Sequence, residues 1–136
     1  MSHHLETATD LVPKIRAGEV TSEALVRDCL NQIEATDGAI QAWAHLDETH
    51  ALEQARALDQ LRRDGRPLGA LHGIPVGVKD IIDTADMPTE YGSPIHAGHR
   101  PGTDATLVAK LREAGAVILG KTVTTEFAFM SPGKTA

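Results

Sequence analysis

Two short apolar segments, separated by a stretch with helical spacing, constrain this 136-residue sequence more than any other feature. Residues 76–82 and 116–119 are rich in Val, Ile and Leu, and segments of this length and composition favour β-strands. Between them, apolar residues recur at helical spacing: Leu107, Val108, Leu111 and Ala114. A strand, a crossover helix and a second strand typically form a βαβ unit, so the sequence predicts a parallel or mixed sheet in residues 67–136.

The first strand of this unit is predicted to lie inside the sheet. Apolar side chains occupy both even and odd positions around residues 76–82, which is typical of a strand buried on both faces. A loop rich in Gly and Pro follows over residues 84–102. Thr103 or Asp104 is expected to cap the crossover helix, and residues 124–129 are expected to open a further helix.

The first half of the chain is predicted to be mainly helical. Its segments with helical spacing are residues 5–15, 25–33 and 51–61. Thr21 or Ser22 is expected to cap the second helix, Asp37–Gly38 to end it, and residues 40–46 to form a short strand. The expected fold class is therefore α/β, with N-terminal helices packed on the first strands of a mixed β-sheet.

The composition fits one globular domain with an aliphatic core. Hydrophobic residues make up 41% of the chain but aromatic residues only 3%, so Leu, Ile, Val and Ala must fill the interior. We expect residues 1–136 to belong to a single domain. Within it, residues 1–66 form a helical segment and residues 67–136 form the start of a sheet.

Charge, cysteine content and hydropathy exclude several classes of protein. The net charge of −6 argues against nucleic acid or an anionic membrane as the main partner. Cys29 is the single cysteine, so an internal disulfide is excluded and a reducing compartment is favoured. No apolar run approaches the ~20 residues that span a bilayer, and the first residues do not resemble a signal peptide. We therefore expect a cytoplasmic protein.

One segment matches the expression for a phosphate-binding loop. Residues 115–122, GAVILGKT, fit the pattern G-x-x-x-x-G-K-T. A true phosphate loop follows a strand and opens a helix, whereas here a predicted helix precedes Gly115 and strand-forming residues fill the gap. Gly115 is better interpreted as the stop of that helix. A nucleotide-binding module using Gly115–Thr122 is kept only as a second alternative.

The histidines and the cysteine give no strong sign of a metal site. His72, His96 and His99 lie near the Gly-rich region, but Pro and Gly around the last two argue against a helix that would align them. We expect these histidines to lie in solvent-exposed loops. Cys29 lies on the apolar side of its helix and is expected to be a buried, inert thiol. No metal and no cofactor is therefore predicted.

Lys79 is the residue least easily explained by packing. It lies at the end of the predicted buried strand, where a charged ammonium is costly unless it is paired or neutral. Three uses are open: an ion pair with Asp80 or Asp83, a side chain that reaches the surface, or a neutral lysine that transfers protons. Spacing alone favours the ion pair. Glycines beside the strand (Gly69, Gly73 and Gly77) suggest the close approach of another backbone, as where a site is assembled.

Four motifs follow one another between about Leu71 and Phe129. They are GIPVGVKD at 73–80, YGSP at 91–94, AGAVILGKT at 114–122 and TEFA at 125–128. In this order they resemble the N-terminal part of the amidase signature enzymes. The helices that precede them fit the N-terminal segment of that family.

The resemblance implies hydrolysis of a carboxamide C–N bond by a serine nucleophile, a second serine in a cis peptide, and a lysine. The lysine of this triad falls on Lys79, which favours its catalytic interpretation. A neutral lysine would take a proton from the bridging serine, and the relay would return one to the departing amine. Asp80 points to the opposite face and is expected to anchor the backbone or a loop. Phe127 and Ala128 match the segment that lines the acyl pocket.

The sequence also departs from the family pattern. In the family, a Gly- and Ser-rich stretch with both serines follows shortly after the equivalent of Gly133, whereas this sequence stops at Ala136. Ser93 and Ser131 lie in the wrong motifs to replace those serines, and Val123 stands where many members have Asn. We therefore expect an incomplete amidase fold, a fragment that is catalytically inactive on its own.

Two functions of the whole enzyme share these motifs. The first is an amidase acting on a small-molecule amide, and the alternative is the glutamine-hydrolysing subunit of an aminoacyl-tRNA amidotransferase. An ammonia-channel partner and dependence on glutamine would distinguish them. The identity of the amide is open because the pocket walls of such folds lie mostly elsewhere in the chain. A homo-oligomer is compatible with the sequence, and neither nucleic acid nor membrane is expected to bind directly.

Overall fold

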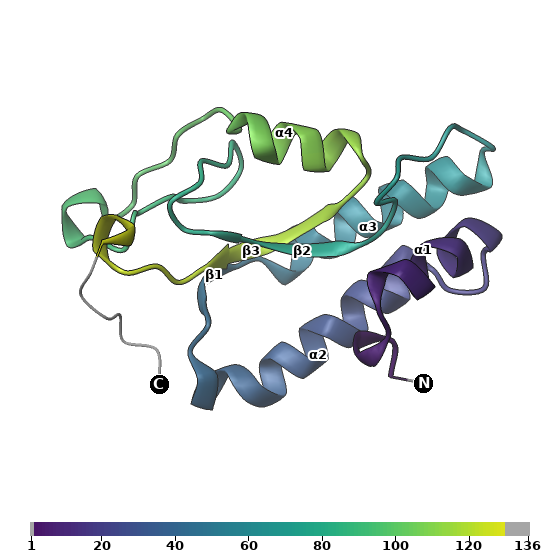
Figure 1. Ribbon diagram of the computed structural model, residues 1–136, viewed down its shortest axis with the longest axis horizontal. Helices are drawn as coiled ribbons and strands as arrows, with labels where there is room; N and C mark the ends of the chain where they lie inside the picture. The colour runs from purple at the N-terminus through teal and green to yellow at the C-terminus, as the bar shows by residue number, and fades with distance from the viewer. Residues whose placement is uncertain (1, 130–136) are drawn as a thin grey trace.

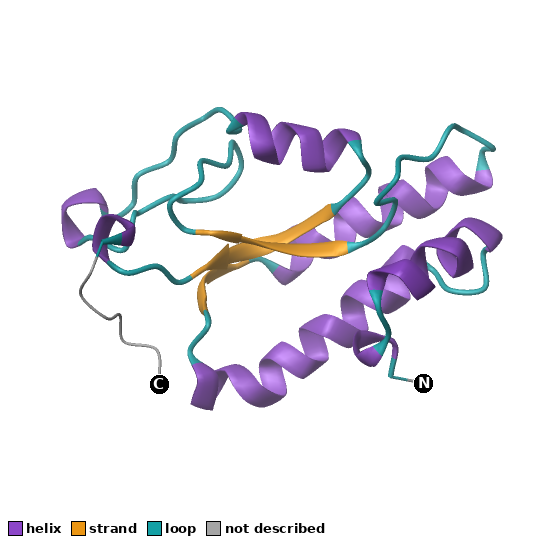
Figure 2. Ribbon diagram, in the orientation of Figure 1, coloured by secondary structure: helices purple, strands orange, loops and turns teal. Residues whose placement is uncertain are grey.

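The computed structural model of the protein describes residues 2–129, in which a three-stranded sheet has helices on both faces (Figure 1; Figure 2). The elements are α1 (Ala8–Ala17), α2 (Ser22–Ile40), β1 (Trp43–Leu46), α3 (Glu48–Arg63), β2 (Pro75–Lys79), α4 (Thr106–Glu113) and β3 (Val117–Thr122). Single 3-10 turns are η1 (His3–Leu5), η2 (Pro94–His96) and η3 (Glu126–Ala128). The strand order is β1-β3-β2, with β2 parallel and β1 antiparallel to β3. The predicted mixed α/β architecture is confirmed.

Strand β3 is the centre of the sheet and is buried on both faces. Val117 and Leu119 pack against apolar side chains of α2 and α3. Ile118 points to the opposite face, where it packs with Val108 of α4 and Met87. Figure 1 shows α4 on one side of the sheet and α2 and α3 on the other. The core is aliphatic, as the composition predicts.

Strand β2 lies at the edge of the described sheet, and the prediction that residues 76–82 form a strand buried on both faces is wrong. The strand ends at Lys79, and the chain turns at Asp80. Val78 is buried towards the α4 side, whereas Gly77 and Lys79 are exposed. Ile82 belongs to the turn, so the apolar run in the sequence joins two different local structures.

The sheet uses residues from both halves of the chain. Strand β1 comes from the predicted helical segment 1–66 and pairs with β3 from the segment 67–136. A further apolar cluster joins α1 and α2 to Ile74, just before β2.

Within residues 2–129, no helix is both long enough and apolar enough to cross a membrane.

Helix α2 begins as predicted but ends later. Its first-turn amides are satisfied by Thr21, whose Oγ1 accepts from Ala24 N at 3.0 Å, and by the buried Asp59 of α3. Asp59 accepts from the backbone N–H groups of Ser22 at 2.8 Å and Glu23 at 3.0 Å. One carboxylate therefore satisfies α2 and ties it to α3.

The predicted end of α2 at Asp37–Gly38 is wrong, because the helix continues to Ile40. Gln41 takes the left-handed conformation that ends it, with φ of 56°. Asp37 helps to close this end, since its carboxylate accepts from Ala42 N and its carbonyl oxygen accepts from Gln41 N, each at 2.7 Å. A glycine costs the interior of a helix only about 1 kcal/mol relative to alanine, so the helix can continue through Gly38.

Two other local predictions are also wrong. Neither Thr103 nor Asp104 caps α4, because the N-cap is Ala105, which has no side-chain cap. Asp104 instead accepts from Ala85 N at 2.7 Å and so closes the loop. The helix expected over residues 124–129 is only the single turn η3, and Phe127 within it has a left-handed backbone with φ of 49°.

His72 is buried, with 2% of its surface exposed, and not in solvent as predicted. The chain passes between α4 and the N-terminal helices at this point: Gly69 lies against the backbone of Ala114, and His72 against Gly115. Burial lowers the pKa of His72, with a smaller opposing effect from the backbone of Leu58. The folded protein therefore holds this imidazole neutral.

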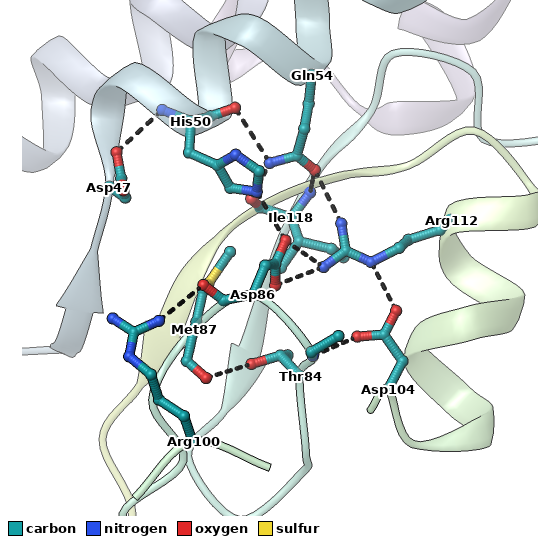
Figure 3. Close-up of polar contacts among 11 residues, drawn as sticks. Asp47, His50, Gln54, Thr84, Asp86, Met87, Arg100, Asp104, Arg112 and Ile118 are labelled. Carbon is teal, nitrogen blue, oxygen red and sulfur yellow. Dashed lines mark hydrogen bonds and ion pairs between the residues drawn. The ribbon is translucent and has the colours of Figure 1, made fainter. Parts of the chain in front are cut away.

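The long loop between β2 and α4 is fixed to α4 by Arg112 (Figure 3). The Nη2 atom of Arg112 lies 2.8 Å from both carboxylate oxygens of Asp86, and its Nε atom lies 2.9 Å from Asp104 Oδ2. The three side chains are between 18% and 27% exposed. One planar guanidinium therefore joins the start and the end of the loop.

Helix α3 holds the same loop from the opposite side (Figure 3). His50 Nε2 lies 2.7 Å from Asp86 Oδ2. Gln54 pairs with both backbone groups of Ile118 in β3, donating at 3.0 Å and accepting at 3.1 Å, and also accepts from Arg112 at 3.2 Å. Burial alone would raise the pKa of Asp86, but His50 and Arg112 outweigh it, and the pKa is lowered.

Replacing Arg112 by Leu is expected to destabilise the protein by about 2 kcal/mol, because two partly buried carboxylates lose their charged donor. Urea unfolding at pH 7 measures this. The matched control is Arg56→Leu, which removes an exposed ion pair with Glu23 and is expected to change stability little. Since the pKa of Asp86 is lowered by folding, the loss in Arg112→Leu should shrink as the pH falls through that lowered value. Equal losses in both variants at pH 7 would contradict the structure.

The buried neutral His72 predicts a loss of stability in mild acid. The unfolded chain binds a proton at this imidazole below about pH 6.5, whereas the folded chain does not until the pH is lower, so stability falls as the pH falls below about 6.5. The difference in unfolding free energy between the parent and His72→Gln should therefore change with pH, by at most about 1.4 kcal/mol per pH unit. His99→Gln, at an exposed position, serves as the control. A pH-independent difference for His72→Gln would refute the assignment.

Candidate functional site

The parallel strands β2 and β3 end at the same edge of the sheet, and all four motifs meet there. Lys79, the last residue of β2, pairs in register with Thr122, the last residue of β3. Asp80 N donates to Thr122 O at 2.8 Å, which continues the pairing into the turn. In open α/β sheets, ligands bind outside the carboxyl ends of parallel strands. We call this edge, with residues 79–80, 88–93 and 122–128, the strand-end site.

Lys79 is exposed, and the expectation that it is buried at the strand end is wrong for the described structure. β2 is an edge strand, and on the face that carries Gly77 and Lys79 the ring of Trp43 and the side chain of Thr122 lie against Gly77 while Lys79 stays exposed. Neither predicted partner pairs with it, because Asp80 contacts Lys121 and Asp83 accepts from the Tyr91 hydroxyl at 2.7 Å. Among residues 2–129, no ion pair includes Lys79.

The buried lysine of the site is Lys121, which the sequence analysis placed in the phosphate-loop pattern and in the motif at 114–122 without assigning it a role of its own. Its side chain is 0% exposed. Its ammonium donates to Asp80 Oδ1 at 3.3 Å, to Pro88 O at 3.2 Å and to Thr89 Oγ1 at 2.6 Å. Burial lowers the pKa of Lys121, while the charge of Asp80 and its hydrogen bond oppose this. A lysine within an apolar, β-branched segment was the signal that could have found it.

Asp80 anchors a loop, as predicted from its position opposite Lys79. Its carboxylate accepts from Glu90 N at 3.3 Å and 3.2 Å, and its carbonyl oxygen accepts from Tyr91 N at 3.0 Å. Together with Lys121, this residue ties the turn after β2 to the loop segment 88–91.

The YGSP motif contacts the TEFA motif at the same edge. Tyr91 O accepts from Phe127 N at 2.8 Å, and Ser93 Oγ donates to Glu126 at 2.7 Å. Tyr91 has a left-handed backbone with φ of 55°, and Phe127 has φ of 49°. Two segments that lie 33 positions apart in the sequence thus hold each other in unfavourable backbone conformations.

An aromatic cluster covers this junction. The ring of His96 lies 5.0 Å from Tyr91, 5.9 Å from His99 and 5.7 Å from Phe127, measured between centroids. His96 and His99, the two histidines of this cluster, therefore lie against aromatic rings. Over the described part of the chain, no group of three or more His, Cys, Asp or Glu residues is placed to hold a metal ion.

Two small cavities open beside the strand ends. The larger, of about 270 Å³, is lined by Ala44, Asp80, Glu90, Gly92, Ser93, Pro94, Ala97, Val123 and Thr124. The smaller, of about 130 Å³, shares Ala44, Asp80 and Glu90 with it. Lys79, Phe127 and Ala128 line neither cavity. The structure therefore brings Phe127 to Tyr91 at the site, outside these two cavities.

The remaining candidates are placed as follows. Residues 117–122 are strand, and Gly115 follows α4 with a left-handed φ of 86°, so the segment 115–122 cannot curl its amides around a phosphate. Cys29 is half-buried, and burial raises the pKa of its thiol, which keeps it protonated. The hydroxyl of Ser93 donates a hydrogen bond to Glu126, and Ser131 lies outside the described residues.

Comparison with known proteins gives one consistent set of relatives. The Amidase family profile matches residues 24–136. The A subunit of the glutamyl-tRNA(Gln) amidotransferase of Chloroflexus aurantiacus is 46% identical over 129 residues, covering 95% of this chain and 26% of its own length. The protein of the same name from Mycobacterium tuberculosis strain H37Ra is 48% identical over 125 residues, covering 91% and 25%. The chain thus spans about a quarter of the length of the curated relatives it matches.

Solved structures repeat the architecture. The peptide amidase of Stenotrophomonas maltophilia is 43% identical with a TM-score of 0.84, over 90% of this chain and 26% of that one. A bacterial aryl acylamidase of the amidase signature family, 23% identical, supports the fold with a TM-score of 0.84 over 90% of this chain and 26% of its own. The resemblance seen in the four motifs is therefore confirmed, and the chain belongs to the amidase family.

Proposed function

We propose that this chain supplies the lysine of an amide-hydrolysing site that acts on carboxamide C–N bonds through a Ser–cisSer–Lys triad. The observation that carries the proposal is the position of Lys79. Lys79 ends β2 beside Thr122. The next residue, Asp80, is hydrogen-bonded to Tyr91, which in turn contacts Phe127. Family membership supports amide hydrolysis as the reaction class.

The proposed chemistry assigns one role to each residue. A serine oxygen attacks the amide carbonyl while the second serine takes its proton and passes one to the Lys79 amine. When the C–N bond breaks, the relay returns a proton to the leaving amine, and water then releases the acyl group. Only an uncharged amine accepts the first proton, so the proposal requires Lys79 to be shielded from water during the reaction. Phe127 and Ala128 are proposed to contact the acyl group.

The second candidate is hydrolysis of glutamine within an amidotransferase. It is favoured by the relatives that are A subunits of glutamyl-tRNA(Gln) amidotransferases, at 46% and 48% identity. This candidate predicts that glutamine is the preferred amide and that activity depends on further subunits. A small-molecule amidase would act on other amides without them. For either function we propose a cytoplasmic location, which the single cysteine supports.

A graft tests the role of Lys79. This chain replaces the matching segment of the Stenotrophomonas maltophilia peptide amidase, and hydrolysis of a peptide amide is measured. The graft should be active, and Lys79→Ala within it should lower kcat by about a thousandfold, because a general base is removed. Lys110→Ala, an exposed lysine on α4, is the matched control and should retain the graft's rate. An active graft in which Lys79→Ala has no effect would remove Lys79 from the triad.

The purified 136-residue chain is expected to show no amide hydrolysis above the buffer rate. The relay needs two serines near Lys79, and Ser93, the one serine within the four motifs, is bonded to Glu126. Release of ammonia from glutamine and from a peptide amide is measured at high protein concentration. Hydrolysis that disappears in Lys79→Ala would overturn this expectation.

A further inference from the structure

We propose that Lys121 is the positioning residue of the strand-end site: its buried ammonium sets the positions of both Lys79 and Phe127. The inference rests on the proposed function for the roles of those two residues, but the contacts that carry it do not. Lys121 does not itself touch substrate, because its side chain is 0% exposed and all of its three N–H donors are used.

The first connection runs from Lys121 to Lys79. Lys121 holds the carboxylate of Asp80 at 3.3 Å, and the backbone of Asp80 is held on both sides, by Thr122 O at 2.8 Å and by Tyr91 N at 3.0 Å. A residue fixed at three points cannot rotate without breaking its bonds. Since Asp80 follows Lys79 directly, the direction in which the Lys79 side chain leaves β2 is fixed with it.

The second connection runs from Lys121 to Phe127. The ammonium holds the loop at Pro88 and Thr89, which lie shortly before Tyr91 in the chain. Tyr91 O then accepts from Phe127 N at 2.8 Å. Tyr91, Phe127 and Ala128 all have left-handed backbones, with φ of 55°, 49° and 57°. Such conformations persist only where the surroundings over-determine them, and the Lys121 anchor adds a constraint to the contacts between the two segments.

Of the acidic groups near Lys121, Asp80 also bonds to the loop backbone, at Glu90 N and Tyr91 N, and Lys121 holds its carboxylate. The other two acidic groups bond elsewhere. Asp83 is bonded to the Tyr91 hydroxyl, and Asp86 to His50 and Arg112. These contacts hold the loop at Asp86 and at the Tyr91 ring, whereas Lys121 alone among the described side chains bonds to the loop backbone at Pro88. Loss of the Lys121 anchor should therefore loosen residues 88–91 and 127 while the Arg112 contacts remain.

The test is a pair of substitutions at the fully buried Thr89 in the 136-residue chain. Thr89→Val keeps the shape but removes the hydroxyl that accepts from Lys121, and Thr89→Ser keeps that hydroxyl. Amide hydrogen exchange is followed by NMR at Tyr91 and Phe127, with Leu30 of α2 as the reference amide. Thr89→Val should speed exchange at Tyr91 and Phe127 about tenfold relative to Leu30, the effect of one lost hydrogen bond. Thr89→Ser should keep the parent ratio.

A purely structural role would raise exchange equally at all three amides, because all would exchange through global unfolding. Equal increases, or no change at Tyr91 and Phe127 in Thr89→Val, would overturn the proposal. A second readout is the nuclear Overhauser effect between the rings of Phe127 and His96, whose centroids lie 5.7 Å apart. It should weaken in Thr89→Val and persist in Thr89→Ser. No substrate is used, so this outcome is independent of the test of Lys79 in the graft.

Discussion

The position of β3 between two apolar layers is the constraint on which the rest of the structure depends. Val117 and Leu119 face α2 and α3, and Ile118 faces α4, so consecutive residues fix helices on opposite sides of one strand. The same strand carries Lys121 into the interior, where its side chain is fully buried. The strand that organises the core therefore also places a charge inside it, and the loop between β2 and α4 must satisfy that charge.

Much of the architecture could be predicted from the sequence because helical periodicity indicates which face of a segment is buried, although the apolar run at 76–82 did not indicate burial correctly. The helical segments, a parallel or mixed sheet and a cap at Thr21 or Ser22 followed from apolar spacing and side-chain chemistry, and the structure has a mixed sheet and the cap at Thr21. Predictions failed where other contacts, local in one case and tertiary in the other, override the preference of a single residue. Gly38 lies within α2 because Asp37 and Gln41 close the helix later, and His72 is buried because backbone segments pass close to it at Gly69 and Gly115.

The candidate site was predictable only in part, and Lys79 and Lys121 show why. A motif identified the segment of Lys79, but its exposure depends on strand order, which no local pattern in residues 76–82 reveals. Lys121 gave a stronger physical signal, because it is a charged residue inside an apolar strand. Its segment was interpreted through sequence motifs, so this signal was not used. Its partners Pro88 and Thr89 lie over thirty positions away in a loop without periodicity, so the contact required the fold.

A buried ion pair is a poor way to gain stability, since a well-packed apolar pair of the same volume is often at least as stable. The Lys121–Asp80 pair is better explained by geometry. An apolar side chain at 121 would pack against many arrangements of the loop, whereas an ammonium with three donors accepts only the one that places Asp80, Pro88 and Thr89 around it. That selectivity suits an edge of the sheet where Tyr91 and Phe127 must both be held in left-handed conformations. The buried charge of Lys121 thus specifies where the exposed residues of the strand-end site lie.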